Sequence, residues 1–332
     1  MKIAVCRPQV PFSRGGAEIF TDELVRQLRE RGHEAEIVSV PFKWYPGQRV
    51  LTQAFLWRLL DLTEADGRPI DLVIATKFPS YCLRHPNKVV WLLHQFRQAH
   101  ELDRTELGQF SESAEDRATR RRVQQLDRTA LGEARRLFAT SRNVAERLQR
   151  STDLEAEVLP HPPQELAYRT DAYDPFVFSV GRLDRAKRID LLIQAAAKQG
   201  VELVISGEGP DRERLETLAN GRVRFTGRVS EAELADLYAR CRAVFYAPVD
   251  EDFGMVPFEA FLAEKPVVTT TDAGGPLDVV RDRETGRVVE PTVDAVAAAL
   301  AIGEEEARVW GRAGKALAEQ VTWDNAIERL LS

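Results

Sequence analysis

Short runs of apolar and β-branched residues alternate with amphipathic stretches along the whole chain of 332 residues. The runs have the length of strands, and the stretches between them space their apolar residues as helices do. This alternation is typical of parallel sheets with crossover helices, so all-α and all-β folds are disfavoured. The runs predict strands over 2–6, 34–40, 71–75, 89–93, 136–139 and 156–159 in the first half, and over 175–180, 202–205, 223–226, 243–246 and 266–270 in the second.

The segment between the first two predicted strands illustrates the pattern. Phe20, Leu24 and Leu28 recur every four residues, and Gly32 follows where a helix would end. The chain therefore begins with a predicted strand, helix and strand that form one βαβ unit.

A proline-rich stretch separates the two halves. Leu159-Pro160-His161-Pro162-Pro163 cannot continue a helix or a central strand, because its prolines lack amide donors. We interpret it as a stiff linker, and the length of the chain also favours two domains with separate cores. The second domain is expected to begin just beyond the linker.

Composition and charge exclude several classes of protein. With 44% hydrophobic and 30% charged residues, the chain fits a soluble globular protein, and its net charge of −6 disfavours general nucleic-acid binding. No apolar run approaches the roughly 20 residues of a membrane span, and the first residues carry charge too early for a signal peptide. We expect a cytoplasmic protein in which Cys6, Cys82 and Cys241 are buried apolar residues. The arginines at 120–122 are expected to form a solvated helix face.

The residues that suggest chemistry follow predicted strands, at the end of an open sheet where ligands bind. Gly15 and Gly16 end the loop after the first strand and open the first helix, where backbone can approach a phosphate or a sugar. A tight turn alone explains them almost as well, and the same holds for the turn Gly207-Glu208-Gly209-Pro210. The first loop lacks the G-x-G-x-x-G fingerprint, which disfavours a nicotinamide cofactor.

Two cations, Arg182 and Lys187, lie on the loop after the first strand of the second half. Such a pair can clamp a diphosphate, and surface solubility is the alternative explanation. Ala186 and Arg188 flank Lys187 where a Walker-type phosphate loop needs glycine and Ser or Thr. An ATPase is therefore disfavoured.

The richest segment runs from Glu251 to Ala260, from a strand exit into an apolar helix. Gly254 frees the backbone, Pro257 suits the first turn of a helix, and Glu259 falls near the positive end of that helix. A surface glutamate stabilised by the helix dipole is the alternative. The tripeptide Asp-Phe-Gly at 252–254 does not indicate a kinase, because no His-Arg-Asp catalytic loop or Val-Ala-Ile-Lys strand accompanies it.

In their order and context these motifs resemble the retaining glycosyltransferases of family 4, whose GT-B fold has two Rossmann-like, doubly wound parallel-sheet domains facing a cleft. The resemblance covers almost the whole chain and is strongest over 179–291, including Asp272-Ala273-Gly274-Gly275. It implies an N-terminal acceptor-side domain over 1–167, a donor domain for a nucleotide sugar over 168–320, and a C-terminal helix over 321–332 that returns to the N-terminal domain. Asp278 stands where the family usually has glutamate.

The resemblance also implies roles for individual residues on the donor side. Ribose hydroxyls would bind Glu259, and the donor sugar would contact Glu251. The diphosphate and sugar would be approached by Arg182, Lys187, the amides of Gly254, Met255 and Val256, and, from the first domain, Gly15 and Gly16.

A histidine, His94, follows the apolar run over 89–93, where similar enzymes carry a histidine beside the reacting sugar. The end of a strand in an open sheet is where sites form, which favours this role over that of a buried structural histidine.

The activity that the resemblance implies is that of a hexosyltransferase, which moves a sugar from a nucleoside diphosphate sugar to an acceptor hydroxyl with retention. Neither a cofactor nor a metal is expected, because Arg182, Lys187 and helix amides already place positive charge on the leaving diphosphate. The stretch Asp250-Glu251-Asp252 has the Asp-x-Asp form that a metal-dependent class uses, so this expectation needs a test. A nucleotide-sugar 2-epimerase of the same fold and a non-catalytic nucleotide-sugar binding subunit are the alternatives. The nucleobase, the sugar, the acceptor and any peripheral membrane contact stay open.

Overall fold

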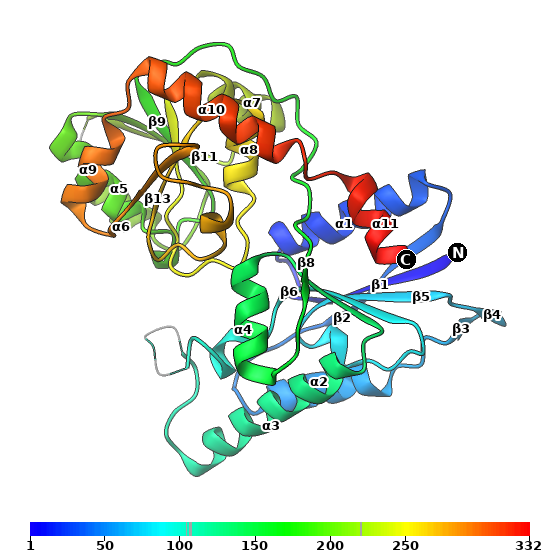
Figure 1. Cartoon of the computed structure of the whole chain (residues 1–332). Coiled ribbons are helices and arrows are strands. Elements are labelled where there is room, and N and C mark those ends of the chain that lie inside the picture. Colours follow the sequence, from blue (N-terminus) through cyan, green and yellow to red (C-terminus); the bar gives the residue numbers. More distant parts are fainter. Residues whose placement is uncertain (104, 106–107, 220) are drawn as a thin grey trace. The chain divides into compact units, whose positions relative to one another are not determined.

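The computed structural model describes residues 1–103, 105, 108–219 and 221–332. The chain divides into two compact units, one of Met1–His161 with Trp323–Ser332 and the other of Pro162–Thr322 (Figure 1). The division falls a few residues before the expected boundary at 167/168 and just after the one at 320/321.

The first unit is built on a six-stranded parallel sheet with the order β2-β1-β5-β6-β7-β8. Its strands are β1 Lys2–Gln9, β2 Glu34–Pro41, β5 Leu72–Lys77, β6 Lys88–His94, β7 Arg136–Ala139 and β8 Glu157–Val158, and β3 Glu64–Ala65 and β4 Arg68–Pro69 form a small antiparallel hairpin. Its helices are α1 Gly16–Glu30, α2 Arg49–Leu59, α3 Ala114–Gly132, α4 Arg142–Thr152 and α11 Trp323–Leu331.

Helices cover both faces of this first sheet (Figure 1). On one face, Phe20 and Leu24 of α1 pack with Trp91 of β6 and with Trp323 and Leu330 of α11 in one buried cluster. The apolar stripe of α11 thus packs against the first unit although the helix comes last in the chain. Helices α2, α3 and α4 cover the other face with a second cluster.

The second unit repeats this architecture with the strand order β11-β10-β9-β12-β13-β14, again all parallel. Its strands are β9 Phe176–Val180, β10 Glu202–Ser206, β11 Val223–Gly227, β12 Ala243–Phe245, β13 Val267–Thr270 and β14 Gly286–Val289. Its helices are α5 Ile189–Gln199, α6 Arg212–Leu218, α7 Glu231–Arg240, α8 Val256–Leu262, α9 Val293–Leu300 and α10 Glu304–Ala318. Helices α5, α6 and α9 contribute to the cluster on one face, and α7 and α8 to that on the other.

The strand order defines where each sheet offers a site. In the first unit the chain adds β2 on one side of β1 and then continues with β5 on its other side. In the second unit the same change of side occurs between β9 and β12. At such a switch point the neighbouring crossovers run to opposite faces, which leaves a crevice outside the carboxyl ends of the strands.

The structure confirms the predicted α/β fold class, and every predicted strand is present. The hairpin β3–β4 and the strand β14 were not predicted. The three cysteines are free and buried, as expected. One expectation is wrong: Arg120 is buried and forms an ion pair with Asp103, whereas Arg121 and Arg122 are exposed. Among the described residues, none of the helices combines the length and hydropathy needed to cross a bilayer.

Candidate functional site

Three loops at the carboxyl ends of β9, β12 and β13 are joined by backbone hydrogen bonds. The amide of Val249 donates to the carbonyl of Ala186 over 2.8 Å, and the amide of Glu251 donates to the carbonyl of Ala273 over 2.8 Å. The Glu251 carbonyl in turn accepts from the amide of Gly275 over 2.8 Å. Motifs that lie far apart in the sequence therefore meet at the switch point of the second unit.

Two glycines of these motifs are required by close backbone packing. A Cβ on Gly207, whose φ is +126°, would lie 1.9 Å from the carbonyl oxygen of Gly181. A Cβ on Gly275 would lie 2.5 Å from the carbonyl oxygen of Asp252. Both glycines bring neighbouring loops into contact, so their presence is explained by the construction of the site.

At the switch point, Lys187, Glu251 and Tyr246 form a largely buried polar cluster. The Lys187 ammonium forms an ion pair with the Glu251 carboxylate and donates to the Tyr246 hydroxyl over 3.2 Å. The side chains of Lys187 and Glu251 are only 21% and 24% exposed. Burial by itself lowers the pKa of Lys187, but Tyr246 and Glu251 outweigh it and hold this pKa above its usual value. The lysine is therefore a permanent positive charge in a partly dehydrated place.

The other expected cation, Arg182, differs from Lys187. Its side chain is 69% exposed, and its Nε lies 3.7 Å from Asp184. An arginine that the sequence analysis did not select, Arg188, is more buried and binds Asp272 through two hydrogen bonds of 2.7 and 2.6 Å. This pair ties the loop after β9 to the loop after β13.

The second predicted glutamate, Glu259, lies in the first turn of α8, which begins at Val256 directly after Gly254 and Met255. Its carboxylate accepts a hydrogen bond of 2.6 Å from the hydroxyl of Tyr238 on α7. Burial raises the pKa of Glu259, and the hydrogen bond from Tyr238 opposes this rise. Neither Tyr238 nor Tyr246 was predicted from the sequence. Tyr246 had a readable signal, because it directly follows β12 at the ligand-binding edge.

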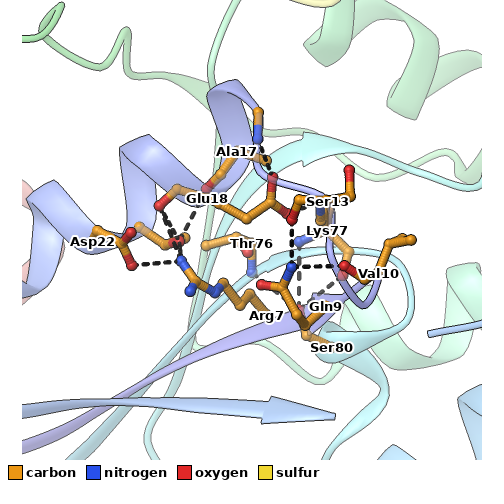
Figure 2. A network of polar contacts seen from close by, with 12 residues as sticks. Arg7, Gln9, Val10, Ser13, Ala17, Glu18, Asp22, Thr76, Lys77 and Ser80 are labelled. Carbon is orange, nitrogen blue, oxygen red and sulfur yellow. Dashed lines mark hydrogen bonds and ion pairs between the residues drawn. The ribbon is translucent and has the colours of Figure 1, made fainter. Parts of the chain in front are cut away.

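In the first unit, the glycine turn before α1 is held by a polar network (Figure 2). The Glu18 carboxylate accepts from the amide of Gly15 over 2.9 Å and lies 3.2 Å from the ammonium of Lys77. Arg7 donates to Asp22 over 2.7 Å, and the Gln9 amide donates to the carbonyl of Ser13 over 2.8 Å. Glu18 was not predicted from the sequence either, although a glutamate three residues after the residue that caps a helix is a recognisable signal.

The predicted histidine, His94, ends β6 and pairs in register with Lys77 of β5. Its Nδ1 lies 2.7 Å from the carbonyl oxygen of Gln95. Because a carbonyl can only accept, Nδ1 carries the hydrogen, and Nε2 is the ring nitrogen that can take up or release a proton. The side chain of Gln95 donates to the buried Asp127 over 3.1 Å. His94 thus lies at the carboxyl end of β6, one strand away from the switch point between β1 and β5, and beside Lys77, which contacts Glu18.

The chain is similar to known proteins in both sequence and fold. Residues 167–316 match the family "Glycosyl transferases group 1". A GDP-mannose-dependent alpha-mannosyltransferase from Mycobacterium tuberculosis is 40% identical over 112 residues, which are 34% of this chain and 29% of that relative. The match thus covers less than two thirds of that relative's length.

Solved structures match almost the entire chain, and two of them illustrate the similarity. The sucrose-phosphate synthase from Thermosynechococcus elongatus superposes with a TM-score of 0.79 at 19% identity, covering 99% of this chain and 97% of that one. Anabaena HepE in complex with UDP and glucose gives a TM-score of 0.70 at 17% identity, with both chains covered completely.

These matches define the class of protein: an α/β protein with the GT-B fold, as the sequence analysis expected. Within that class, residues 167–316 match the glycosyl transferases group 1 family, which confirms the resemblance stated from the motifs.

Proposed function

We propose that this protein is a retaining glycosyltransferase that moves a sugar from a nucleoside diphosphate sugar to an acceptor hydroxyl. The observation that carries the proposal is the largely buried cluster of Lys187, Glu251 and Tyr246 at the switch point of the second unit, with Glu259 on the following helix. The names of the M. tuberculosis relative and of the Anabaena complex refer to GDP-mannose and to UDP, which supports a nucleoside diphosphate sugar as donor.

This reaction requires that the negative charge that develops on the leaving diphosphate be stabilised. When the bond between the anomeric carbon and the diphosphate oxygen breaks, its electrons stay on the diphosphate, and the sugar carbon becomes electron-poor. The Lys187 ammonium supplies positive charge for the leaving group in a place where water screens it little, and Arg182 adds a second, exposed charge. Glu251, held by Lys187, is the carboxylate that we assign to the donor sugar.

The remaining predicted residues fall into two groups. In the second unit, we assign Glu259 to the ribose hydroxyls and the amides of Gly254, Met255 and Val256 to the sugar and phosphate. In the first unit, we assign Gly15 and Gly16 to the diphosphate and His94 to the reacting sugar, where its Nε2 exchanges a proton or a hydrogen bond with a sugar hydroxyl. The acceptor oxygen forms the new bond to the anomeric carbon, and its proton is released to the departing diphosphate or to solvent. The cytoplasmic location stays a prediction.

A ligand screen followed by turnover tests this proposal. The melting temperature of the protein should rise with one of UDP-, GDP-, ADP- or dTDP-sugars, because a ligand that binds the native state stabilises it. The selected donor should then release nucleoside diphosphate when acceptors are added. Interconversion of the sugar at C2 would favour the 2-epimerase, and tight binding without turnover over an acceptor panel would favour the binding subunit.

We also propose that the reaction needs no metal. Glu251, the middle residue of the Asp-x-Asp-like stretch, already has the Lys187 ammonium as its cation. Sugar transfer should therefore continue in excess EDTA at an unchanged rate. Complete loss of activity that Mg²⁺ or Mn²⁺ restores would make Asp250 and Asp252 metal ligands and would overturn the assignment of the site.

Replacing Glu259 with alanine should weaken donor binding by about 10- to 150-fold, because it removes a charge-assisted hydrogen bond worth roughly 1.5 to 3 kcal/mol. Calorimetric titration with the donor measures this change. Glu231, which is exposed at the start of α7, gives a control, since Glu231→Ala should leave the dissociation constant unchanged. A Glu259→Ala protein with the wild-type dissociation constant would remove the ribose assignment.

A further inference from the structure

One buried tyrosine holds the carboxylate of Glu259. Tyr238 is fully buried on α7, and its hydroxyl donates to Oε2 of Glu259 over 2.6 Å. Its ring is fixed edge-on by Phe178, at 5.1 Å between ring centroids, and by Tyr168, at 6.1 Å. A donor that is locked in this way defines the orientation of the carboxylate it binds.

We propose that Tyr238 is a positioning residue for donor recognition. Its hydroxyl donates a hydrogen bond to Oε2 of Glu259 and so directs Oε1 toward the ribose hydroxyls. This inference rests on the proposed function, because it takes the ribose assignment of Glu259 as given. No atom of Tyr238 needs to contact the donor, since the residue acts through the carboxylate.

The hydrogen bond also favours the ionised form of Glu259. Burial raises the pKa of this carboxyl, and Tyr238 is the group that opposes the rise. A protonated carboxyl loses acceptor capacity toward the ribose hydroxyls, so donor affinity depends on the charge that Tyr238 stabilises.

The other ionisable groups around Glu259 do not form a hydrogen bond with its carboxylate among the described residues. The hydroxyl of Tyr168, in the segment before β9, is buried and has no hydrogen-bond partner among the described residues. At the start of α7, Glu231 accepts from Gln164 over 2.8 Å. On α10, which packs against α8, Lys315 and Arg312 face Glu264.

The test compares Tyr238→Phe with the wild type. The substitution keeps the ring and removes only the hydroxyl. The KM for the donor should rise about 10-fold at pH 7 while kcat changes less than twofold, because the lost bond acts on ground-state binding. The acid limb of kcat/KM for the donor should also move to higher pH, since Glu259 then protonates more readily. A purely structural role of Tyr238 predicts no movement of that limb.

Tyr168→Phe is the matched control. It removes a buried hydroxyl that has no partner among the described residues, so the pH profile should stay at that of the wild type. In a Glu259→Ala background, Tyr238→Phe should have no further effect on donor KM.

The outcomes separate the two proposals. If Glu259→Ala itself leaves donor binding unchanged, the ribose assignment fails. If Glu259→Ala weakens binding but Tyr238→Phe keeps both the wild-type KM and the wild-type acid limb, the positioning role of Tyr238 is overturned. A melting temperature within a few degrees of the wild type confirms that the Tyr238→Phe protein is folded.

Discussion

Replacing Lys187 with alanine is expected to lower kcat by about 100- to 1,000-fold, the usual effect of removing one preorganised charge from a site where negative charge develops. The Lys187 side chain is largely buried, so its charge acts on the diphosphate with little screening by water. Because the charge of the leaving group grows as the bond breaks, the loss should appear in kcat as well as in donor KM. Steady-state kinetics with the donor identified by the ligand screen measure both constants.

A neighbouring cation provides the control for this experiment. Arg185 lies on the same 3₁₀ turn, Arg185–Lys187, but is exposed. Arg185→Ala should therefore change kcat less than threefold. Lys187→Met keeps most of the buried side-chain volume and should reproduce the kinetic loss with a smaller effect on stability. A Lys187→Met protein with kcat within threefold of the wild type would show that the ammonium does not act on the leaving group.

The fold could be predicted because its signal is repeated and local. Most strands of the two sheets are short apolar runs between amphipathic stretches, and a buried parallel strand needs little else to be recognised. The strand β14 escaped because its four residues, Gly-Arg-Val-Val, contain a glycine and a charge. That glycine is explained only by the structure, where a Cβ on Gly286 would lie 1.9 Å from the carbonyl oxygen of Val267. The hairpin β3–β4 has only two residues in each strand and leaves no periodic pattern.

The sequence predicts where the residues of the candidate site lie, but it does not predict which of them contact one another. Lys187 and Glu251 follow strands at the ligand-binding edge, so the sequence indicates both, yet nothing in it says that they form an ion pair. The side-chain partners of Lys187, Glu251 and Glu259 belong to other segments of the chain. Glu259 meets Tyr238 from another helix, and Arg188, which the sequence shows only as a residue unsuited to a Walker loop, meets Asp272. Such partners are brought together by the topology of the sheet, which motif spacing does not encode.

The side-chain partners of Lys88 could not be predicted from the sequence either. This residue stands at the boundary of a predicted strand and was not included in it. The structure places it as the first residue of β6, fully buried. Its ammonium donates to the carbonyl oxygens of Tyr81, Leu83 and Ala130 at 3.0, 3.1 and 2.8 Å. This one side chain therefore ties β6 to α3 and to the segment that follows β5.

Lys88→Met is expected to lower the free energy of unfolding of the first unit by about 3 kcal/mol, because three carbonyls lose a donor that contributes roughly 1 kcal/mol to each. Urea unfolding followed by circular dichroism measures this change. Lys43→Met is the control, since Lys43 is exposed and its loss should cost less than about 0.5 kcal/mol. An effect of Lys88→Met as small as that of the control would mean that the three carbonyls find other partners.

The pH dependence of the same pair of proteins tests the state of the amine. Burial lowers the pKa of Lys88 from its usual 10.5 to about 8, although the carboxylate of Glu133, 3.7 Å away, opposes the shift. Between pH 8 and 10.5 the unfolded chain then binds more protons at this residue than the folded protein does, so wild-type stability gains from Lys88 as pH rises. Methionine does not titrate and adds no pH dependence to the stability. The other titratable groups contribute the same pH dependence to both proteins. The stability difference between wild type and Lys88→Met should therefore widen over this window. A difference that stays constant to pH 10.5 would show that the three carbonyls and Glu133 keep the ammonium charged in the folded protein.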